Sequence, residues 1–163
     1  MLFYFFDKNE NKALDYFTFI RITIRNFVIQ KSIIMTKAIT TLDDIKLLVN
    51  TFYSRVQKDE LIGPIFNEKI QNRWDEHLAK MYTFWQTVLL DDHTYFGRPF
   101  PPHANLPVEM EHFDRWLSIF NQTVDELFEG EKAEEAKWRG SQMAKMFLSK
   151  IEYFRELKQK PLQ

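Results

Sequence analysis

Apolar residues recur every three or four positions along this chain from residue 41 onward, the spacing that places them on one face of an α-helix. A first helix is predicted to follow Thr41, which together with Asp44 resembles a capping box. The pair Gly63 and Pro64 predicts a turn after it. A second helix is predicted to start at Asn72, whose side chain can accept from the first backbone N–H groups.

The helical pattern resumes after a proline-rich connector. Pro107 suits the first turn of a third helix, which Gly130 would close. A fourth helix is predicted over residues 131–157, with small and apolar residues on one stripe. Since we find no strand with a pairing partner in residues 35–163, we predict an all-α fold of one domain.

Residues 1–34 do not continue the helical pattern, although they are rich in Phe and Ile. Charged residues interrupt every window of about 20 residues, the length that a membrane-spanning helix needs. A basic start and a small-residue cleavage site, typical of a secretory signal, are lacking as well. We interpret residues 1–34 as a leader outside the fold, with Met35 as an alternative start, and residues 35–163 as the domain.

The connector FGRPFPPHANLP holds four of the six prolines in the chain and surrounds His103 with them. Proline fixes the backbone angle φ and removes a donor, so this segment cannot form an ordinary helix. A surface loop whose histidine faces water is the simplest interpretation of such a segment. A rigidly held ligand is the other interpretation, and other parts of the chain must decide between them.

Composition narrows the classes of function. The net charge of −1 and the absence of a basic run mixed with aromatic residues argue against nucleic acid and anionic membranes as partners. A chain without cysteine forms no disulfide, iron–sulfur cluster or covalent c-type haem, and suits a reducing cytoplasm. Aromatic residues make up 16% of the chain, more flat apolar surface than a small helical domain needs.

Three polar aromatic side chains lie on the apolar stripes of the first three predicted helices: Tyr53, His77 and Trp116. A buried donor without a partner costs about 1 to 3 kcal/mol, so each of them requires one. Ordinary core networks satisfy many such groups, and each residue taken singly is explained in that way. Taken together with a rigidly held His103, they indicate a pocket with a histidine on one side and donors on the other.

The ordered set of motifs in residues 41–154 resembles the group III truncated haemoglobins: FYSRV, GPIF, WDEHLAKMYTFW, YFGRPFPPHANLP, FDRWLSIF and SQMAKMF. The resemblance implies a truncated globin fold, a two-over-two helical sandwich that encloses a non-covalent b-type haem. It implies that His103 binds the iron and that Tyr53 and Trp116 face the bound gas. His77 corresponds to the distal histidine of that family.

The remaining positions implied by the resemblance surround the haem. Phe66 corresponds to a phenylalanine packed on the porphyrin, and Lys80 to a lysine near a haem propionate. Four more residues are expected along the cavity: Met81, Phe84, Trp85 and Phe113. His93 and His112 are expected to face solvent. The absence of an HExxH motif, of histidine-rich spacing and of a suitably placed carboxylate pair argues against a zinc hydrolase.

The resemblance implies that oxygen, NO, CO or peroxide binds at a five-coordinate iron. Two hydrogen-bond donors would retain oxygen, which favours redox chemistry such as NO dioxygenation or peroxidase-like turnover over oxygen transport. Such an activity requires an unidentified reductase, because the chain carries no flavin motif. A sensor or carrier without turnover and a helical interaction module without haem are the alternatives. We expect a cytoplasmic monomer.

Overall fold

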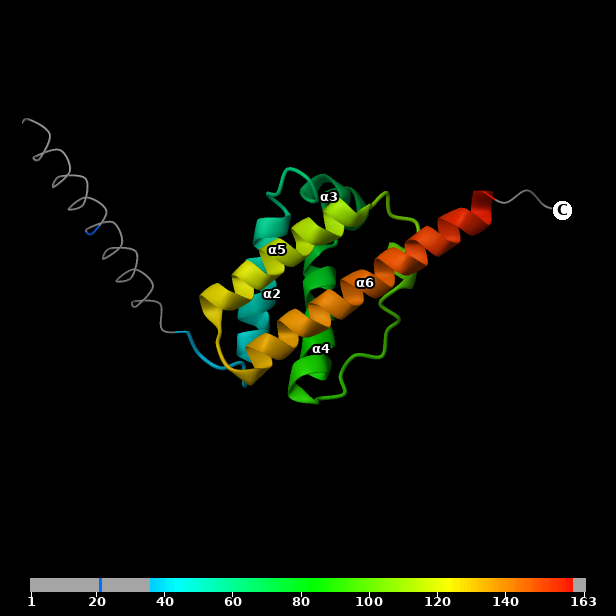
Figure 1. Ribbon diagram of the computed structural model, residues 1–163. Helices are drawn as coiled ribbons and strands as arrows, with labels where there is room; N and C mark the ends of the chain where they lie inside the picture. Colours follow the sequence, from blue (N-terminus) through cyan, green and yellow to red (C-terminus); the bar gives the residue numbers. More distant parts are fainter. Residues whose placement is uncertain (1–20, 22–35, 160–163) are drawn as a thin grey trace, which may run out of the picture. The chain divides into compact units, whose positions relative to one another are not determined.

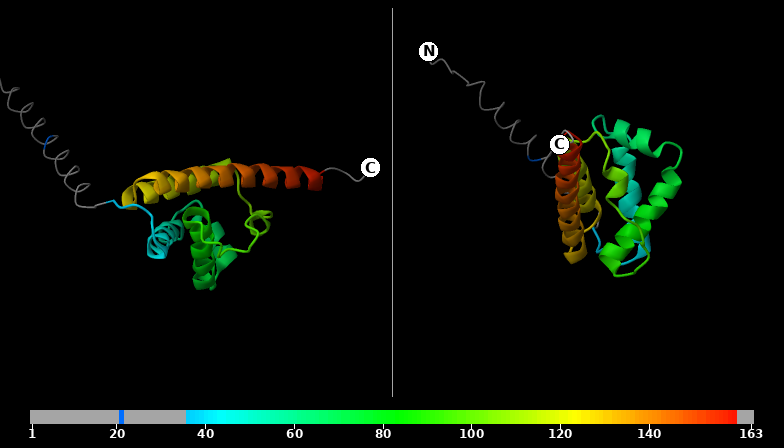
Figure 2. Two further views of the ribbon diagram at one scale, coloured as in Figure 1. Left: turned by 90° about the horizontal axis from the view of Figure 1, so that it is seen from below. Right: turned by 90° about the vertical axis from the view of Figure 1, so that its right-hand side faces the viewer.

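The computed structural model describes Arg21 and residues 36–159, in which the regular elements are helices and one isolated β-bridge joins Lys37 to Phe128. Figure 1 shows the order of the elements, and Figure 2 shows two layers, α2 with α4 and α5 with α6. The interpretation of residues 1–34 as a leader concerns residues that, apart from Arg21, lie outside the part of the chain that the structure describes. The elements are α2 (Leu42–Val56), α3 (Gly63–Ile70), α4 (Trp74–Leu90), the 3₁₀ turn η1 (Pro101–His103), α5 (Met110–Leu127) and α6 (Glu131–Gln159).

Helix α2 begins with the predicted capping box. The backbone N–H of Asp44 donates to Oγ1 of Thr41 at 3.3 Å, and the N–H of Thr41 donates back to Oδ2 of Asp44 at 2.9 Å. The carboxylate of Asp44 also accepts from the N–H of Thr40 at 3.0 Å and pairs with Lys37. These contacts satisfy backbone donors that the start of a helix leaves without intrahelical partners.

The hydrogen bonds around Asp44 make it a pH-dependent stabiliser of the fold. Burial alone would raise its pKa, but the contacts from Lys37, Thr40 and Thr41 outweigh burial and hold the pKa well below the usual range. A carboxyl with a lowered pKa stabilises the native state fully above its unfolded pKa of about 4, and this stabilisation is lost as the pH falls through the folded value.

We expect Asp44→Asn to lower the free energy of unfolding at pH 7 by about 1 to 3 kcal/mol, because the charge that accepts these bonds is removed. The difference from the parent protein should shrink below pH 4. Urea unfolding between pH 7 and pH 2.5 measures both effects. Asp43→Asn is the matched control, since the Asp43 carboxylate is 89% exposed and should change stability little. Equal effects of the two variants would contradict this role for Asp44.

The segment predicted as a turn at Gly63 and Pro64 is instead the start of helix α3. Pro64 lies in its first turn, where the missing N–H has no helical acceptor to lose. A Cβ on Gly63 would lie 2.9 Å from the carbonyl oxygen of Val56, so only glycine allows α3 to pack this closely on the end of α2. The prediction that Asn72 caps the next helix is also wrong, because Arg73 occupies that position.

The boundaries of the last two helices differ from the prediction. Helix α5 starts at Met110 with Glu109 as its N-cap, so Pro107 precedes the first turn. The helix ends at Leu127, three residues before Gly130. Gly130 has a φ of +88°, and its carbonyl accepts from the N–H groups of Ala133 and Glu134 in the first turn of α6, so it starts that helix rather than closing α5.

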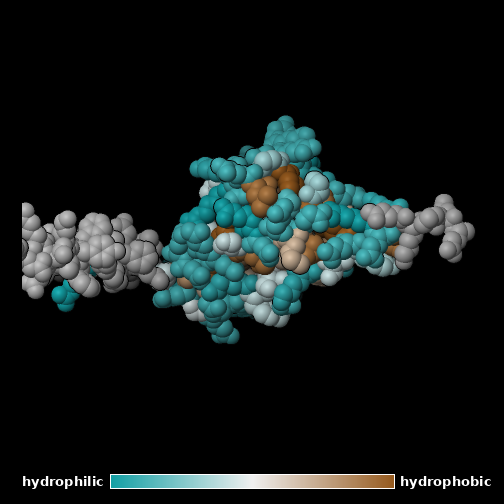
Figure 3. Space-filling model, turned by 45° about the horizontal axis from the view of Figure 1, so that its top comes forward, coloured by the Kyte–Doolittle hydropathy of each residue, from teal (hydrophilic) through white to brown (hydrophobic). Residues whose placement is uncertain are grey.

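The surface on the face shown in Figure 3 is mainly hydrophilic, with separate hydrophobic patches between the polar side chains. Several large apolar side chains on α6 are exposed: Trp138, Met146, Tyr153, Phe154 and Leu157. None of the helices in the described part of the chain combines the length and apolar character needed to cross a membrane.

Candidate functional site

A cavity of about 500 Å³ lies between the helices, within the range of small-molecule and cofactor sites. All ten residues expected at a site line it, although they come from four helices and the connector. They are Tyr53, Phe66, His77, Lys80, Met81, Phe84, Trp85, His103, Phe113 and Trp116. The wall is mainly apolar, with a few polar atoms in it. The structure therefore brings the ten residues together around one space.

His103 lies at the end of the 3₁₀ turn η1, and its ring lines the cavity. Its Nδ1–H donates to the carbonyl of Pro99 at 2.7 Å. A carbonyl only accepts, so Nδ1 carries the proton and Nε2 keeps a free lone pair. Phe147 of α6 packs on the ring with centroids 4.7 Å apart. The imidazole is thus held on two sides, with its basic nitrogen available.

The environment favours the uncharged form of this imidazole. Burial lowers the pKa of His103 below its usual value, the hydrogen bond to Pro99 opposes that shift, and the charge of Lys69 adds to it. A neutral imidazole is the form that binds a metal. Because the ring of His103 lines the cavity, the interpretation of the connector as a surface loop with a water-facing histidine is wrong.

His77 of α4 carries a polar atom without a partner. Its Nε2 is buried and forms no hydrogen bond with any described residue. Burial lowers the pKa of His77 to about 4, with smaller contributions from the protonated form of His103 and from the charge of Lys80, so the ring is neutral at pH 7. Tyr53 packs against it edge to face with centroids 4.8 Å apart. A buried nitrogen on a cavity wall without a protein partner indicates a bound group or water beside it.

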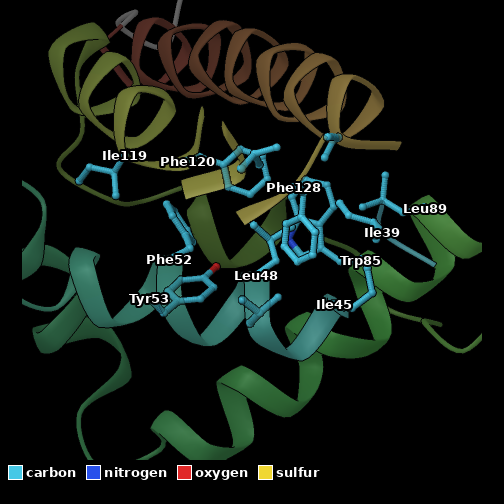
Figure 4. Close-up of a cluster of buried hydrophobic side chains, with 14 of the residues drawn as sticks. Ile39, Ile45, Leu48, Phe52, Tyr53, Trp85, Leu89, Ile119, Phe120 and Phe128 are labelled. Carbon is cyan, nitrogen blue, oxygen red and sulfur yellow. The ribbon is translucent and has the colours of Figure 1, made fainter. Parts of the chain in front are cut away.

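Tyr53 and Trp116 bring two more polar groups to the wall. Tyr53 is only 5% exposed, and burial raises the pKa of its hydroxyl, so it remains a protonated donor. No hydrogen bond joins its hydroxyl or the indole N–H of Trp116 to another residue in the range 36–159. Figure 4 shows Tyr53 and Phe52 side by side on α2, with Phe120 of α5 nearby. The cavity therefore holds two donors with capacity for a ligand.

Three cations surround part of the same cavity: Lys69 at the end of α3, Arg73 before α4, and Lys80 on α4. All three are exposed, and Glu76 is the acidic residue among the lining side chains. Exposed ammonium and guanidinium groups at the edge of an apolar space suit a ligand with an apolar body and anionic ends. Only Lys80 was expected from the sequence; Lys69 lies in α3, which was not predicted, and Arg73 lies at the start of the helix predicted from Asn72 but was not assigned to a site.

The other two histidines have different surroundings. His93 is exposed, as expected. His112 is half-buried and lines the cavity, so the expectation that it faces solvent is wrong. Its Nδ1 accepts from the backbone N–H of Glu109 at 3.0 Å, a contact that holds the ring at the start of α5. This N-cap contact is the physical reason why His112 turns toward the protein.

The set of donors suits a flat organic cofactor with one imidazole ligand. No cluster of three or more His, Asp or Glu side chains able to hold a metal ion alone occurs among the described residues. A single free imidazole nitrogen, large aromatic side chains and cations at the edge match the needs of a haem. The unpartnered Nε2 of His77 lies on the wall of that space. The residues present therefore fit the group that the sequence implied.

Comparisons with known proteins agree with this fit. The family model described as bacterial-like globin matches residues 37–149. The group 3 truncated hemoglobin ctb of Campylobacter jejuni is 34% identical over 109 residues, which cover 64% of this chain and 86% of that protein.

Solved structures show the same fold. The crystal structure of the group III truncated hemoglobin from Campylobacter jejuni matches with a TM-score of 0.67 and 31% identity, over 72% of this chain and 95% of that chain. A truncated oxygen-avid haemoglobin from Bacillus subtilis matches with a TM-score of 0.58 and 28% identity, over 66% and 93%. The predicted all-α, two-over-two sandwich is confirmed. This chain belongs to the bacterial-like globin family, and its similarity is to the group III truncated haemoglobins.

Proposed function

We propose that this globin holds a non-covalent b-type haem in its cavity, with Nε2 of His103 as the protein ligand to a five-coordinate iron. Haem binding in general follows from the family, and the family binds gaseous ligands such as O₂. The observation that carries the assignment is the hydrogen bond from Nδ1–H of His103 to Pro99, because it leaves Nε2 as the free nitrogen.

The other cavity residues divide by chemistry. The aromatic and thioether side chains supply flat apolar contacts for the porphyrin: Phe66, Met81, Phe84, Trp85 and Phe113. Lys80 supplies a cation for a haem carboxylate, and Lys69 and Arg73 reach the same space. These contacts would hold the cofactor without a covalent bond, consistent with a chain that has no cysteine.

When bound, haem supplies an iron centre that takes O₂, NO, CO or peroxide and exchanges electrons. Tyr53 and Trp116 would donate hydrogen bonds to such a ligand from a wall that is mainly apolar. Two donors worth about 1.5 kcal/mol each would slow the loss of a polar ligand about a hundredfold. His77 offers a third polar atom, whose neutral ring can donate or accept.

Slow release favours reaction over delivery. A carrier or sensor that works without turnover needs its ligand to leave readily, whereas the two donors retain it. We therefore assign the protein to redox chemistry with NO, peroxide or oxygen, such as NO dioxygenation or a peroxidase-like reaction. Electrons would come from a separate reductase.

Membership of the globin family argues against a helical module without haem. A cytoplasmic monomer suits this role and the absence of cysteine.

Absorption spectra of the purified, haem-loaded protein test the proposal. We expect a Soret band that shifts on reduction and shifts again with CO, as for an iron with one histidine and one open position. NO consumption by the oxygenated protein, measured with an NO electrode, should exceed that of free haem. A protein that takes up no haem would contradict the cofactor assignment. Normal spectra without NO or peroxide turnover would contradict only the redox role.

A further inference from the structure

Gly140 lies near the middle of α6, buried against two aromatic rings of α5. A Cβ built at this position would lie 3.3 Å from Phe120, closer than ordinary van der Waals contact, and 3.4 Å from Trp116, at the limit of such contact. A glycine in a helix interior costs about 1 kcal/mol relative to alanine. Its φ is not positive, so no special backbone conformation requires glycine here. The close approach of α6 to the two rings is what requires it.

The rings beside Gly140 belong to a stack that cannot move freely. Trp116 stacks on Phe120 with centroids 5.1 Å apart, and Phe120 stacks on Trp85 at 5.0 Å. Phe52 of α2 packs its edge against Trp116 and Phe120 at 5.1 and 5.2 Å. Figure 4 shows Phe120 between residues of α2 and α4. Because such interiors are close-packed, a group added behind the stack must displace its rings.

Both ends of this stack, Trp85 and Trp116, line the cavity. A displacement that starts at Gly140 therefore reaches the cavity wall. The indole N–H of Trp116 is one of the two donors assigned to the ligand. A hydrogen bond weakens when its donor moves by a few tenths of an ångström or turns out of line.

We propose that Gly140 is a positioning residue that sets the place of the Trp116 indole and thereby the preference of the cavity for a polar diatomic ligand over an apolar one. This inference rests on the proposed function. Because Gly140 has no side chain, α6 lies close against the rings of Trp116 and Phe120, and this contact limits the positions that the rings can take. Its effect is transmitted through Trp116, without contact between Gly140 and the ligand.

The test compares Gly140→Ala with Gln142→Ala in the full, haem-loaded chain. Gln142 is exposed on the same helix, so its substitution adds no group behind the stack. For Gly140→Ala we expect the oxygen dissociation rate to change about threefold to tenfold and the CO rate clearly less, since tenfold corresponds to about 1.4 kcal/mol. The melting temperature should change little, because the gain in helix propensity offsets the tight contact.

Combining Gly140→Ala with Trp116→Phe tests whether Gly140 acts on gas release through the indole of Trp116. In the Trp116→Phe background, Gly140→Ala should no longer alter the ratio of the two rates, because the donor is gone. An undiminished effect in that background would overturn the proposal. The ultraviolet resonance Raman bands of the indoles provide a readout that does not depend on gas binding, and Trp116→Phe identifies the Trp116 contribution to them.

The two readouts separate this inference from the proposed function. Shifted Trp116 bands in Gly140→Ala without any change in gas release would uphold the positioning of the indole and contradict its role as a donor. Unshifted bands and unchanged gas release, in a protein whose Trp116→Phe variant does lose oxygen faster, would overturn the role of Gly140 and uphold the donor.

Discussion

His103→Ala is expected to lose most of its haem, or to bind haem only when imidazole is added to fill the space left by the ring. The reason is that Nε2 of His103 is the one nitrogen on the cavity wall whose partner nitrogen is fixed by a backbone carbonyl, at 2.7 Å from Pro99. Such a hydrogen bond orients a ligating imidazole and raises its basicity. Haem content per chain and the Soret band of the ferrous protein measure the effect.

His93→Ala is the matched control, because His93 is exposed and lies in the non-helical segment that leads from α4 to the connector. It should keep the parent spectrum and haem content. Far-ultraviolet circular dichroism of His103→Ala shows whether the helices remain, since loss of the fold would also release haem. Normal haem binding by a folded His103→Ala would contradict the ligand assignment, and His77, with its unpartnered Nε2, would then be the candidate.

The helices could be predicted from the sequence because their apolar faces repeat with the helical period. The start of α2 was predicted to the residue, since Thr41 and Asp44 bond to each other's backbone within one turn. The starts of α4 and α5 were not, because Asn72 and Pro107 are locally suitable residues that the tertiary structure does not use. Local patterns determine that a helix exists more reliably than where it ends.

Helix α3 was missed for a different physical reason. Gly63 and Pro64 are typical of turns, and eight residues are too few to show a clear period. The glycine is required by the backbone of α2, a contact between segments that no local pattern contains. The same error hid Lys69, which α3 places at the cavity.

Part of the cavity was predictable from the residue pattern and the rest from the resemblance to a family, but the surroundings of these residues were not predictable. Three- and four-residue spacing placed Tyr53, His77 and Trp116 on inward faces, and the cavity is where these faces meet. Phe147 carried the same helical signal on α6, and its contact with the ring of His103 could have been sought there. The hydrogen bond from His103 to Pro99 and the inward turn of His112 depend on exact backbone positions, which spacing does not give.

Tyr53→Phe is expected to raise the oxygen dissociation rate about tenfold or more, because a hydrogen bond worth about 1.4 kcal/mol corresponds to a factor of ten. The substitution removes one hydroxyl and keeps the ring, so the edge contacts with Phe52 and His77 at 4.8 Å should persist. Burial raises the pKa of this hydroxyl, so it remains a donor across the pH range of the assay. Stopped-flow displacement of oxygen by CO from the ferrous protein measures the rate.

The response to CO decides whether Tyr53 acts as a donor or as part of the wall. Bound CO carries little negative charge, so it gains little from a hydrogen bond, and its dissociation rate should change much less than that of oxygen. Trp116→Phe should act in the same direction. The double variant should depart from additivity if both donors bond the same ligand atom. Equal changes for both gases would indicate altered access, and no change for either gas would remove Tyr53 from the ligand site.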